Sequence, residues 1–150
     1  VPNIITSLEL MPEVMEQKNL HLQAKYRQIK ANETRCELTK CDDADYLVVA
    51  FGSAARIAEK SMEVARAHDI RLGLFRPITL WPFPEKELRN AAAGKKGILV
   101  AEINAGQMVQ DVSLAVGSNI PVAHFGRLGG IVPDPEEIVN ALKTKLIDNE

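Results

Sequence analysis

The sequence is poor in the residues that form metal centres and aromatic binding platforms. It contains two cysteines, Cys36 and Cys41, which we expect to be a reduced structural pair because no Cys-x-x-Cys motif is present. Iron–sulfur ligation by this chain is therefore not supported. The histidines have no metal-site spacing and are expected to be surface or packing residues: His21, His68 and His124. Aromatic residues make up only 5% of the chain and the net charge is −2, which argues against nucleic-acid binding.

Long apolar runs and targeting segments are absent as well. The longest apolar runs are far shorter than a membrane span, and no charged segment followed by an apolar one stands at the start. The hydrophobic share of 46% and the charged share of 25% are those of an ordinary globular domain, so we expect a cytoplasmic protein without a membrane partner. Because the sequence begins with Val1 rather than Met, we expect a piece of a longer protein or a chain that has lost a leader or tag.

One stretch, from Asp45 to Ser53, organises the rest of the sequence. The run Tyr46–Phe51 is continuously apolar or aromatic, which is typical of a strand buried on both faces of a sheet. Gly52 permits a sharp turn, and Ser53 is expected to cap the helix that follows. This strand–loop–helix corner predicts a parallel α/β sheet with Tyr46–Phe51 as its central strand.

The same alternation of strand and helix continues along the chain. Further strands are predicted at residues 72–75, 98–103 and 121–125, and helices at 54–67, 84–93 and 108–116. The clearest helix start is at Asp134, where Pro135 and Glu137 complete a capping box. The alternation predicts a three-layer α/β/α domain with a mainly parallel sheet and helices on both faces.

The first part of the chain differs from this pattern. Pro12 is suited to the first turn of a helix running to about Ala31. Its apolar stripe must pack on the following domain or on another subunit, and consists of Met15, Leu22, Tyr26 and Ile29. A short half-buried strand, Arg35–Thr39, is expected at an edge of the sheet. We therefore divide the chain into a lead-in with a linker helix, 1–32, and an α/β domain, 33–150.

The unusual loops of the sequence all follow predicted strands. In a parallel sheet such loops emerge at the carboxyl edge, where open α/β sheets bind ligands or partners. We call this set the rim; its candidate residues for an interface or a ligand are Gly52, Ser53, Arg76, Pro77, Trp81, Phe83, Asn104, Gly106, Gln107, Arg127, Gly129 and Gly130.

The sequence leaves two readings open for several residues at or near the rim. Trp81 and Phe83 suit either core plugs or interface anchors on a loop stiffened by prolines. The charged residues near this edge either form a buried ion-pair network or only orient the loops: Arg76, Arg127 and Glu102. No Gly-x-Gly-x-x-Gly motif, Walker lysine or nucleophile–base pair is present, so no catalytic residue is assigned and the isolated chain is expected to be inactive.

Several motifs together resemble a known family. They are Phe51-Gly52-Ser53, the string Arg76-Pro77-Ile78-Thr79-Leu80-Trp81-Pro82-Phe83-Pro84, Glu102–Gln107, Gly126–Gly130 and Pro133–Ile138. This set is similar to the C-terminal part of the α-type, thiamine-diphosphate-carrying subunit of 2-oxoacid:ferredoxin oxidoreductases. The lead-in Pro2–Ile5 and the segment Leu22–Tyr26 are most similar to the 2-ketoisovalerate (branched-chain) member.

The resemblance implies a transketolase C-terminal-like domain with a five-stranded sheet in the order 1-3-2-4-5 and an antiparallel strand 1. It also implies an enzyme that decarboxylates a 2-oxoacid on thiamine diphosphate, passes electrons through iron–sulfur clusters to ferredoxin and forms an acyl-CoA. The pyrimidine-binding domain would precede Val1, and the site for Mg and the diphosphate would lie on another subunit, since no Gly-Asp-Gly motif occurs here. A different class of function stays open: a free-standing small-ligand-binding or regulatory α/β module that uses the same rim.

Overall fold

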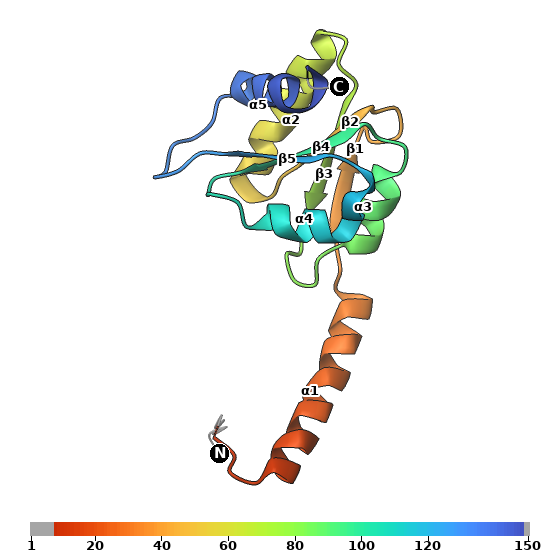
Figure 1. The fold of residues 1–150 in the computed structure, drawn as a ribbon, viewed down its shortest axis with the longest axis vertical. Helices are drawn as coiled ribbons and strands as arrows, with labels where there is room; N and C mark the ends of the chain where they lie inside the picture. The colour runs from red at the N-terminus through yellow and green to blue at the C-terminus, as the bar shows by residue number, and fades with distance from the viewer. Residues whose placement is uncertain (1–7, 149–150) are drawn as a thin grey trace.

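The computed structural model describes residues 8–148, which contain one five-stranded sheet in the order β1-β3-β2-β4-β5 (Figure 1). β1 pairs antiparallel with β3 and all other neighbours are parallel, which confirms the predicted fold. The strands are β1 (Cys36–Thr39), β2 (Tyr46–Val49), β3 (Leu72–Pro77), β4 (Gly97–Glu102) and β5 (Val122–Gly126). The lead-in Pro2–Ile5 lies outside the described residues.

β2 is the central strand, as its apolar run predicts. It lies between β3 and β4, and all of its residues are buried. Successive side chains of a strand point to opposite faces of the sheet. Tyr46 and Val48 therefore pack in one core cluster, and Leu47 and Val49 pack in the other. Both faces of β2 are shielded from solvent, which explains why charged residues are missing from this strand.

Helices cover both faces of the sheet, as Figure 1 shows. One layer holds α2 (Gly52–Ala67) and α5 (Pro135–Leu142), which continues into the π-helical turn η2 (Lys143–Ile147). The other holds α3 (Glu85–Ala92) and α4 (Met108–Val116), followed by the 3-10 turn η1 (Gly117–Asn119). The small buried side chains of α2, including Ala54, Ala58 and Ala65, allow its backbone to approach the sheet closely.

The start of α2 differs from the prediction. The helix begins at Gly52, Phe51 is its N-cap, and no side chain caps it, so the prediction that Ser53 is the cap is wrong. Gly52 turns the chain with a φ of 56°, but as the first residue of the helix, so the helix starts two residues earlier than expected. Ser53 is then already inside the helix, and its side chain faces solvent.

The capping box predicted for the last helix is confirmed. Asp134 accepts a hydrogen bond from the backbone amide of Glu136, and the Glu137 carboxylate accepts one from the amide of Asp134, at 2.9 Å each. The buried stripe of the last helical segment consists of Ile138, Leu142 and Leu146. Asp69, which follows α2, has a φ of 61°, a conformation that Asp tolerates better than most residues.

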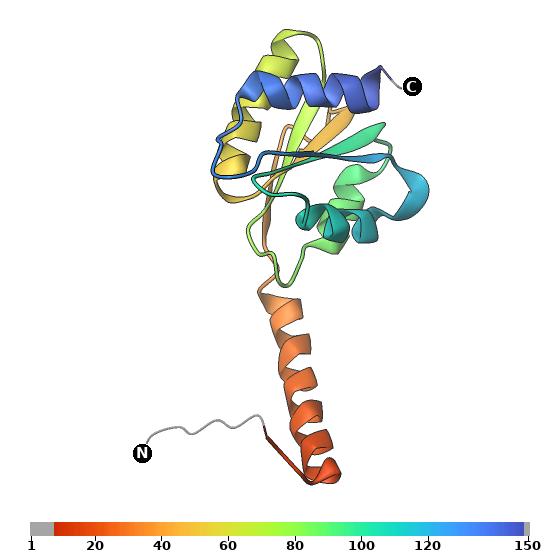
Figure 2. The ribbon, with the colours of Figure 1, turned by 60° about the vertical axis from the view of Figure 1, so that its left-hand side comes forward.

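α1 (Pro12–Asn32) projects away from the α/β domain (Figure 2). None of its residues is buried, and its apolar stripe contacts the domain where Tyr26 meets Trp81. Packing of the stripe on another subunit stays a prediction. β1 follows α1 and lies at the edge of the sheet, as predicted. The division into 1–32 and 33–150 stays a proposal. Within residues 8–148 no helix combines the length and the apolar character needed to cross a membrane.

Candidate docking rim

The rim loops lie at one edge of the sheet, as the topology requires. β2, β3, β4 and β5 run parallel, so the loops that follow them emerge at their common carboxyl edge. In Figure 1 the loop 78–84 lies next to the C-terminal end of α1, whereas the loop 127–134 extends from the far side of the sheet. The rim is therefore an extended surface rather than one pocket.

The centre of the rim is organised by Glu102, the last residue of β4. Its side chain is fully buried and accepts hydrogen bonds from the backbone amides of Met108 at 2.8 Å and Val109 at 3.2 Å. It also accepts from the amide of Gln107, at 3.2 Å, and from the Asn104 side chain, at 3.2 Å. A carboxylate at the N-terminus of a helix satisfies amides that have no partner inside the helix. Glu102 thus caps α4 from the neighbouring strand.

The same network shapes the loop between β4 and α4. Asn104 Oδ1 accepts a hydrogen bond from the backbone amide of Gly106, at 2.7 Å. Gly106 has a φ of 105°, which favours glycine strongly. The predicted rim residues Asn104, Gly106 and Gln107 are therefore held together in one rigid loop, whose anchor is Glu102.

Of the two readings left open for the charged residues at this edge, the buried ion-pair network is wrong, because the three side chains do not meet. Arg76 donates to Glu37 on the edge strand β1, at 2.8 Å. Arg127 Nη1 lies 3.3 Å from Glu137 on α5, on another part of the rim. β2 separates β3 from β4, so Arg76 and Glu102 lie two strands apart. The alternative reading, that these residues orient the loops, agrees with the geometry.

His124 is a neighbour of this network that the sequence did not reveal. Its Nε2 atom lies 3.6 Å from Glu102 Oε2 and has no hydrogen-bond partner within the described residues. A Cβ atom at Gly126 would contact this imidazole and the Asn104 carbonyl oxygen, so only glycine fits there. The pairing of β4 with β5 brings Glu102 and His124 together, and no spacing along the chain indicates this contact. The end of an apolar strand at Glu102, just before a helix, was the one available hint.

The two aromatic residues of the rim lie in different environments. Trp81 is 55% exposed and its ring stands edge-on to Tyr26 of α1, with 5.5 Å between the ring centroids. Trp81 is therefore no core plug. Phe83 is half-buried and packs against the core cluster of the α3–α4 face. The loop is tied down where Thr79 Oγ1 donates to the Pro82 carbonyl oxygen, at 2.8 Å.

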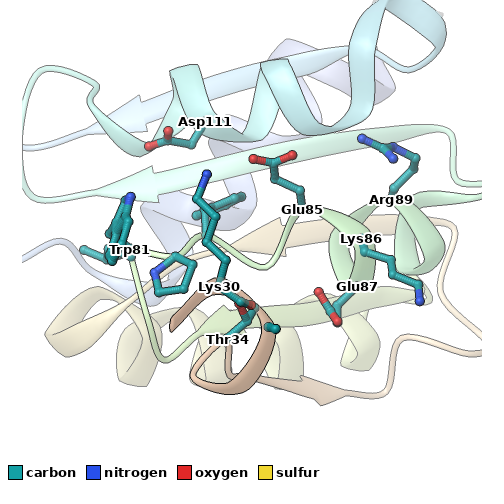
Figure 3. Close-up of a pocket in the computed structure, with 12 residues that line it drawn as sticks. Lys30, Thr34, Trp81, Glu85, Lys86, Glu87, Arg89 and Asp111 are labelled. Atoms are coloured by element: carbon teal, nitrogen blue, oxygen red, sulfur yellow. The ribbon is translucent and has the colours of Figure 1, made fainter. Parts of the chain in front are cut away.

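A groove of about 600 Å³ runs beside Trp81 (Figure 3). Lys30 reaches into it from α1, and Asp111 contributes from α4. Charges of both signs lie along the walls: Lys30, Glu85, Lys86, Glu87, Arg89 and Asp111.

The remaining rim residues lie in two other places. Gly52, Ser53 and Asn104 line a smaller pocket of about 250 Å³ beside the start of α2. Gly129 and Gly130 adopt φ values of 65° and 80° in the loop that follows β5. This loop exposes its apolar side chains, namely Leu128, Ile131 and Val132.

The residues present do not fit a resident metal or cluster. Burial raises the pKa of the Cys36 and Cys41 thiols, which opposes the thiolate form that a cluster needs. The Cys41 thiol already donates to the Leu74 carbonyl oxygen, at 3.2 Å. Within residues 8–148 no three His, Cys, Asp or Glu side chains are grouped to hold a metal ion.

Comparisons with known proteins agree on one family. A sequence model of the family described as "Pyruvate:ferredoxin oxidoreductase core domain II" matches residues 44–138. The chain is 37% identical, over 141 residues, to a ketoisovalerate oxidoreductase subunit VorB of Methanothermobacter thermautotrophicus, covering 94% of this chain and 40% of that protein. It is 36% identical over 101 residues to a 2-oxoglutarate synthase subunit KorA of Methanothermobacter marburgensis, covering 67% of this chain and 27% of that protein. The chain thus spans less than half the length of these relatives.

Two solved structures show the same fold. A 2-oxoglutarate:ferredoxin oxidoreductase from Magnetococcus marinus, with 2-oxoglutarate, coenzyme A and succinyl-CoA bound, superposes with a TM-score of 0.75 at 22% identity and covers 91% of this chain and 24% of that one. The second structure is a split-gene transketolase, solved as an inactive tetramer of beta subunits. It superposes with a TM-score of 0.62 at 19% identity and covers 75% of this chain and 41% of that one. Both share the transketolase C-terminal-like arrangement.

Proposed function

Because the chain belongs to the family of pyruvate:ferredoxin oxidoreductase core domain II, we propose that it serves as this domain in a subunit of a 2-oxoacid:ferredoxin oxidoreductase. The observation that carries the proposal is the alignment of 94% of the chain with a ketoisovalerate oxidoreductase subunit. The enzyme converts a 2-oxoacid and coenzyme A to an acyl-CoA and CO₂, and the electrons pass to ferredoxin. Its substrate is 2-ketoisovalerate or a related branched-chain 2-oxoacid, and it works in the cytoplasm.

The role of this chain is assembly rather than chemistry. In this proposal thiamine diphosphate, Mg and the iron–sulfur clusters belong to other parts of the complex. It is supported by the lack, among residues 8–148, of three grouped metal-binding side chains, and by the raised pKa of both thiols, which disfavours a cluster. The rim presents an exposed Trp81 and a rigid loop anchored on Glu102. Such a preorganised surface loses little conformational entropy when a partner covers it. The rim faces the pyrimidine-binding domain of the same subunit or a neighbouring subunit.

Purification of the native enzyme through a tag on this subunit tests the proposal. The other oxidoreductase subunits are expected to copurify, and the preparation should reduce ferredoxin or a viologen dye with 2-ketoisovalerate and coenzyme A. 2-Oxoglutarate and pyruvate serve as comparison substrates. A tagged subunit that purifies without partners, or a preparation that no 2-oxoacid activates, contradicts the proposal.

Calorimetry on the isolated chain separates the proposal from the alternative of a free-standing ligand-binding module. The isolated chain is expected to show no heat of binding with thiamine diphosphate and Mg²⁺, and no 2-oxoacid-dependent dye reduction. Micromolar binding of a small ligand at the rim would favour the alternative instead.

A further inference from the structure

A very short junction joins α1 to the edge strand β1. α1 ends at Asn32 and β1 begins at Cys36, so the junction consists of residues 33–35 (Figure 2). Even a junction of this length would act as a swivel if its backbone were free, because each residue has two soft dihedral angles. The hydrogen bonds of the junction therefore decide whether α1 is a flexible tether or a fixed arm.

The first two residues of the junction are bound to the last turn of α1. The amide of Glu33 donates to the Ile29 carbonyl oxygen, at 2.8 Å. The hydroxyl of Thr34 donates to the Lys30 carbonyl oxygen, at 2.9 Å. Carbonyl groups in the last turn of a helix have no amide partner inside the helix, and these two bonds satisfy them. They also fix the direction in which the chain leaves α1.

The last residue of the junction is bound to the loop 78–84. The Arg35 carbonyl oxygen accepts hydrogen bonds from the amides of Ile78, at 3.0 Å, and Thr79, at 3.2 Å. The Arg35 amide donates to Thr79 Oγ1, at 3.0 Å. Both backbone groups of Arg35 are thus held by one segment, directly before β1 starts to pair with β3. We call these contacts of Arg35 with Ile78 and Thr79 the clasp.

Thr79 is the centre of the clasp. Its hydroxyl accepts from the Arg35 amide and donates to the Pro82 carbonyl oxygen, at 2.8 Å. A hydroxyl group has one donor and two acceptor positions, so one side chain can make both bonds at once. The same hydroxyl therefore closes the loop 78–84 on itself and fastens this loop to the junction.

A second contact between α1 and the same loop lies further along the helix. The Tyr26 ring stands edge-on to Trp81, with 5.5 Å between the ring centroids. Tyr26 lies six residues before Asn32, which is about 9 Å along the helix axis. A rod that is attached at one point can swing, whereas a rod that is attached at two separate points cannot. The clasp and the Tyr26–Trp81 contact are two such points.

We propose that α1 is a rigid arm of the α/β domain, locked by the clasp and by the Tyr26–Trp81 contact, and that the loop 78–84 sets its direction. The lock couples two parts of the molecule: a partner that displaces the loop at Trp81 redirects α1, and a displacement of α1 moves the loop. The inference does not depend on which enzyme contains the chain, and so goes beyond the proposed function.

Residual dipolar couplings of the isotope-labelled chain, weakly aligned in solution, test the inference. These couplings average over motions up to milliseconds, which includes the range of hinge motions. For a fixed arm, the couplings of residues 14–30 and of the α/β domain fit one alignment tensor, with α1 oriented as in Figure 2. If the couplings of α1 fit only a separate tensor of about half the magnitude or less, α1 swivels and the inference is overturned.

Two substitutions at Thr79 separate its hydroxyl group from its shape. Thr79→Val keeps the shape but removes the hydrogen bonds to Arg35 and Pro82, so the couplings of α1 should fall to about half or less. Thr79→Ser keeps the hydroxyl and should leave the couplings as in the parent. If Thr79→Val leaves α1 as ordered as in the parent, or Thr79→Ser loosens it equally, the clasp is not the lock and the inference is overturned.

Tyr26→Ala removes the second contact alone. Because the clasp remains, this change should reduce the couplings of α1 by a smaller factor than Thr79→Val does. Unchanged couplings would mean that the aromatic contact does not hold the arm, which contradicts the inference.

Thr144→Val is the matched control. It makes the same chemical change at an exposed threonine of η2, whose hydroxyl donates to the Asn140 carbonyl oxygen at 2.9 Å, at the end of the molecule opposite α1 (Figure 2). The couplings of α1 should not change, and a loss as large as in Thr79→Val overturns the inference. In every variant, unchanged couplings of the α/β domain show that the domain is still folded.

Discussion

Glu102 shows how one buried side chain fixes part of the rim. The carboxylate receives amide hydrogen bonds from Gln107, Met108 and Val109, and so substitutes for an ordinary N-cap residue on α4. Its position at the end of β4 links the register of the central sheet to the loop that carries Asn104 and Gly106. A change at Glu102 should therefore affect both the stability of the fold and the shape of the rim.

Glu102→Ala is expected to lower the free energy of unfolding by about 2–4 kcal/mol, because it leaves several amides at the start of α4 without an acceptor. Urea unfolding of the isolated chain measures this loss. Glu59→Ala, at an exposed position of α2, serves as the control and should change stability by less than about 0.5 kcal/mol. A variant as stable as the control would mean that water replaces the carboxylate without cost.

The pair Asp43–Arg66 gives the fold a dependence on pH. Two hydrogen bonds from the Arg66 guanidinium, of 2.8 and 2.7 Å, hold the pKa of Asp43 at about 2, below its ordinary value of 3.8. Because the folded pKa is the lower one, the pair stabilises the fold above about pH 4, and this contribution is lost as the pH falls toward 2.

Asp43→Asn should therefore reduce the change in urea midpoint between about pH 5 and pH 2. The effect is expected to be small, since the carboxylate is exposed and solvent screens the pair. Asp42→Asn, next to it in the chain but without an ion pair among residues 8–148, is the matched control. The account of this pair fails if the two variants have the same pH profile.

At the scale of the elements, local signals explain most of what the sequence predicted. The apolar run of β2 and the capping box of α5 are encoded in neighbouring residues, so both were predicted in place. The cap of α2 was not, because the helix starts at Gly52, which has a positive φ, two residues before the predicted start. The cap of α4 comes from β4 rather than from the residue before the helix, and only the folded sheet brings Glu102 to those amides.

Asp134→Ala tests the cap of α5. The substitution removes the acceptor for the Glu136 amide and is expected to cost about 1 kcal/mol, seen as a lower Tm of the isolated chain. Asn140→Ala, on the exposed face of the same helix, is the control and should lie within about 0.5 kcal/mol of the parent. Equal melting temperatures of the parent and Asp134→Ala would contradict the role of the capping box.

At the scale of the whole molecule, the topology placed the rim correctly but not the contacts within it. Parallel strands alone put the predicted loops at one edge. The separation of Arg76 from Glu102 depends on the order of the strands, and the exposure of Trp81 depends on where α1 ends. Neither the order of the strands nor the place where α1 ends can be read from spacing along the chain. For this reason the reading of an ion-pair network was wrong, and the role of Trp81 stayed open.

The central claim is that the rim holds this domain to the rest of an oxidoreductase, and Trp81→Ala tests it most directly. Two quantities are measured: the free energy of unfolding of the isolated chain, and the affinity with which the variant subunit assembles into the complete enzyme, with Leu114→Ala as the exposed control. Since Trp81 is 55% exposed, the isolated variant should unfold almost like the parent, while assembly should weaken by about 2 kcal/mol or more, roughly thirtyfold. A loss of about 3–5 kcal/mol in the stability of the isolated chain, with no separate defect in assembly, would contradict the claim.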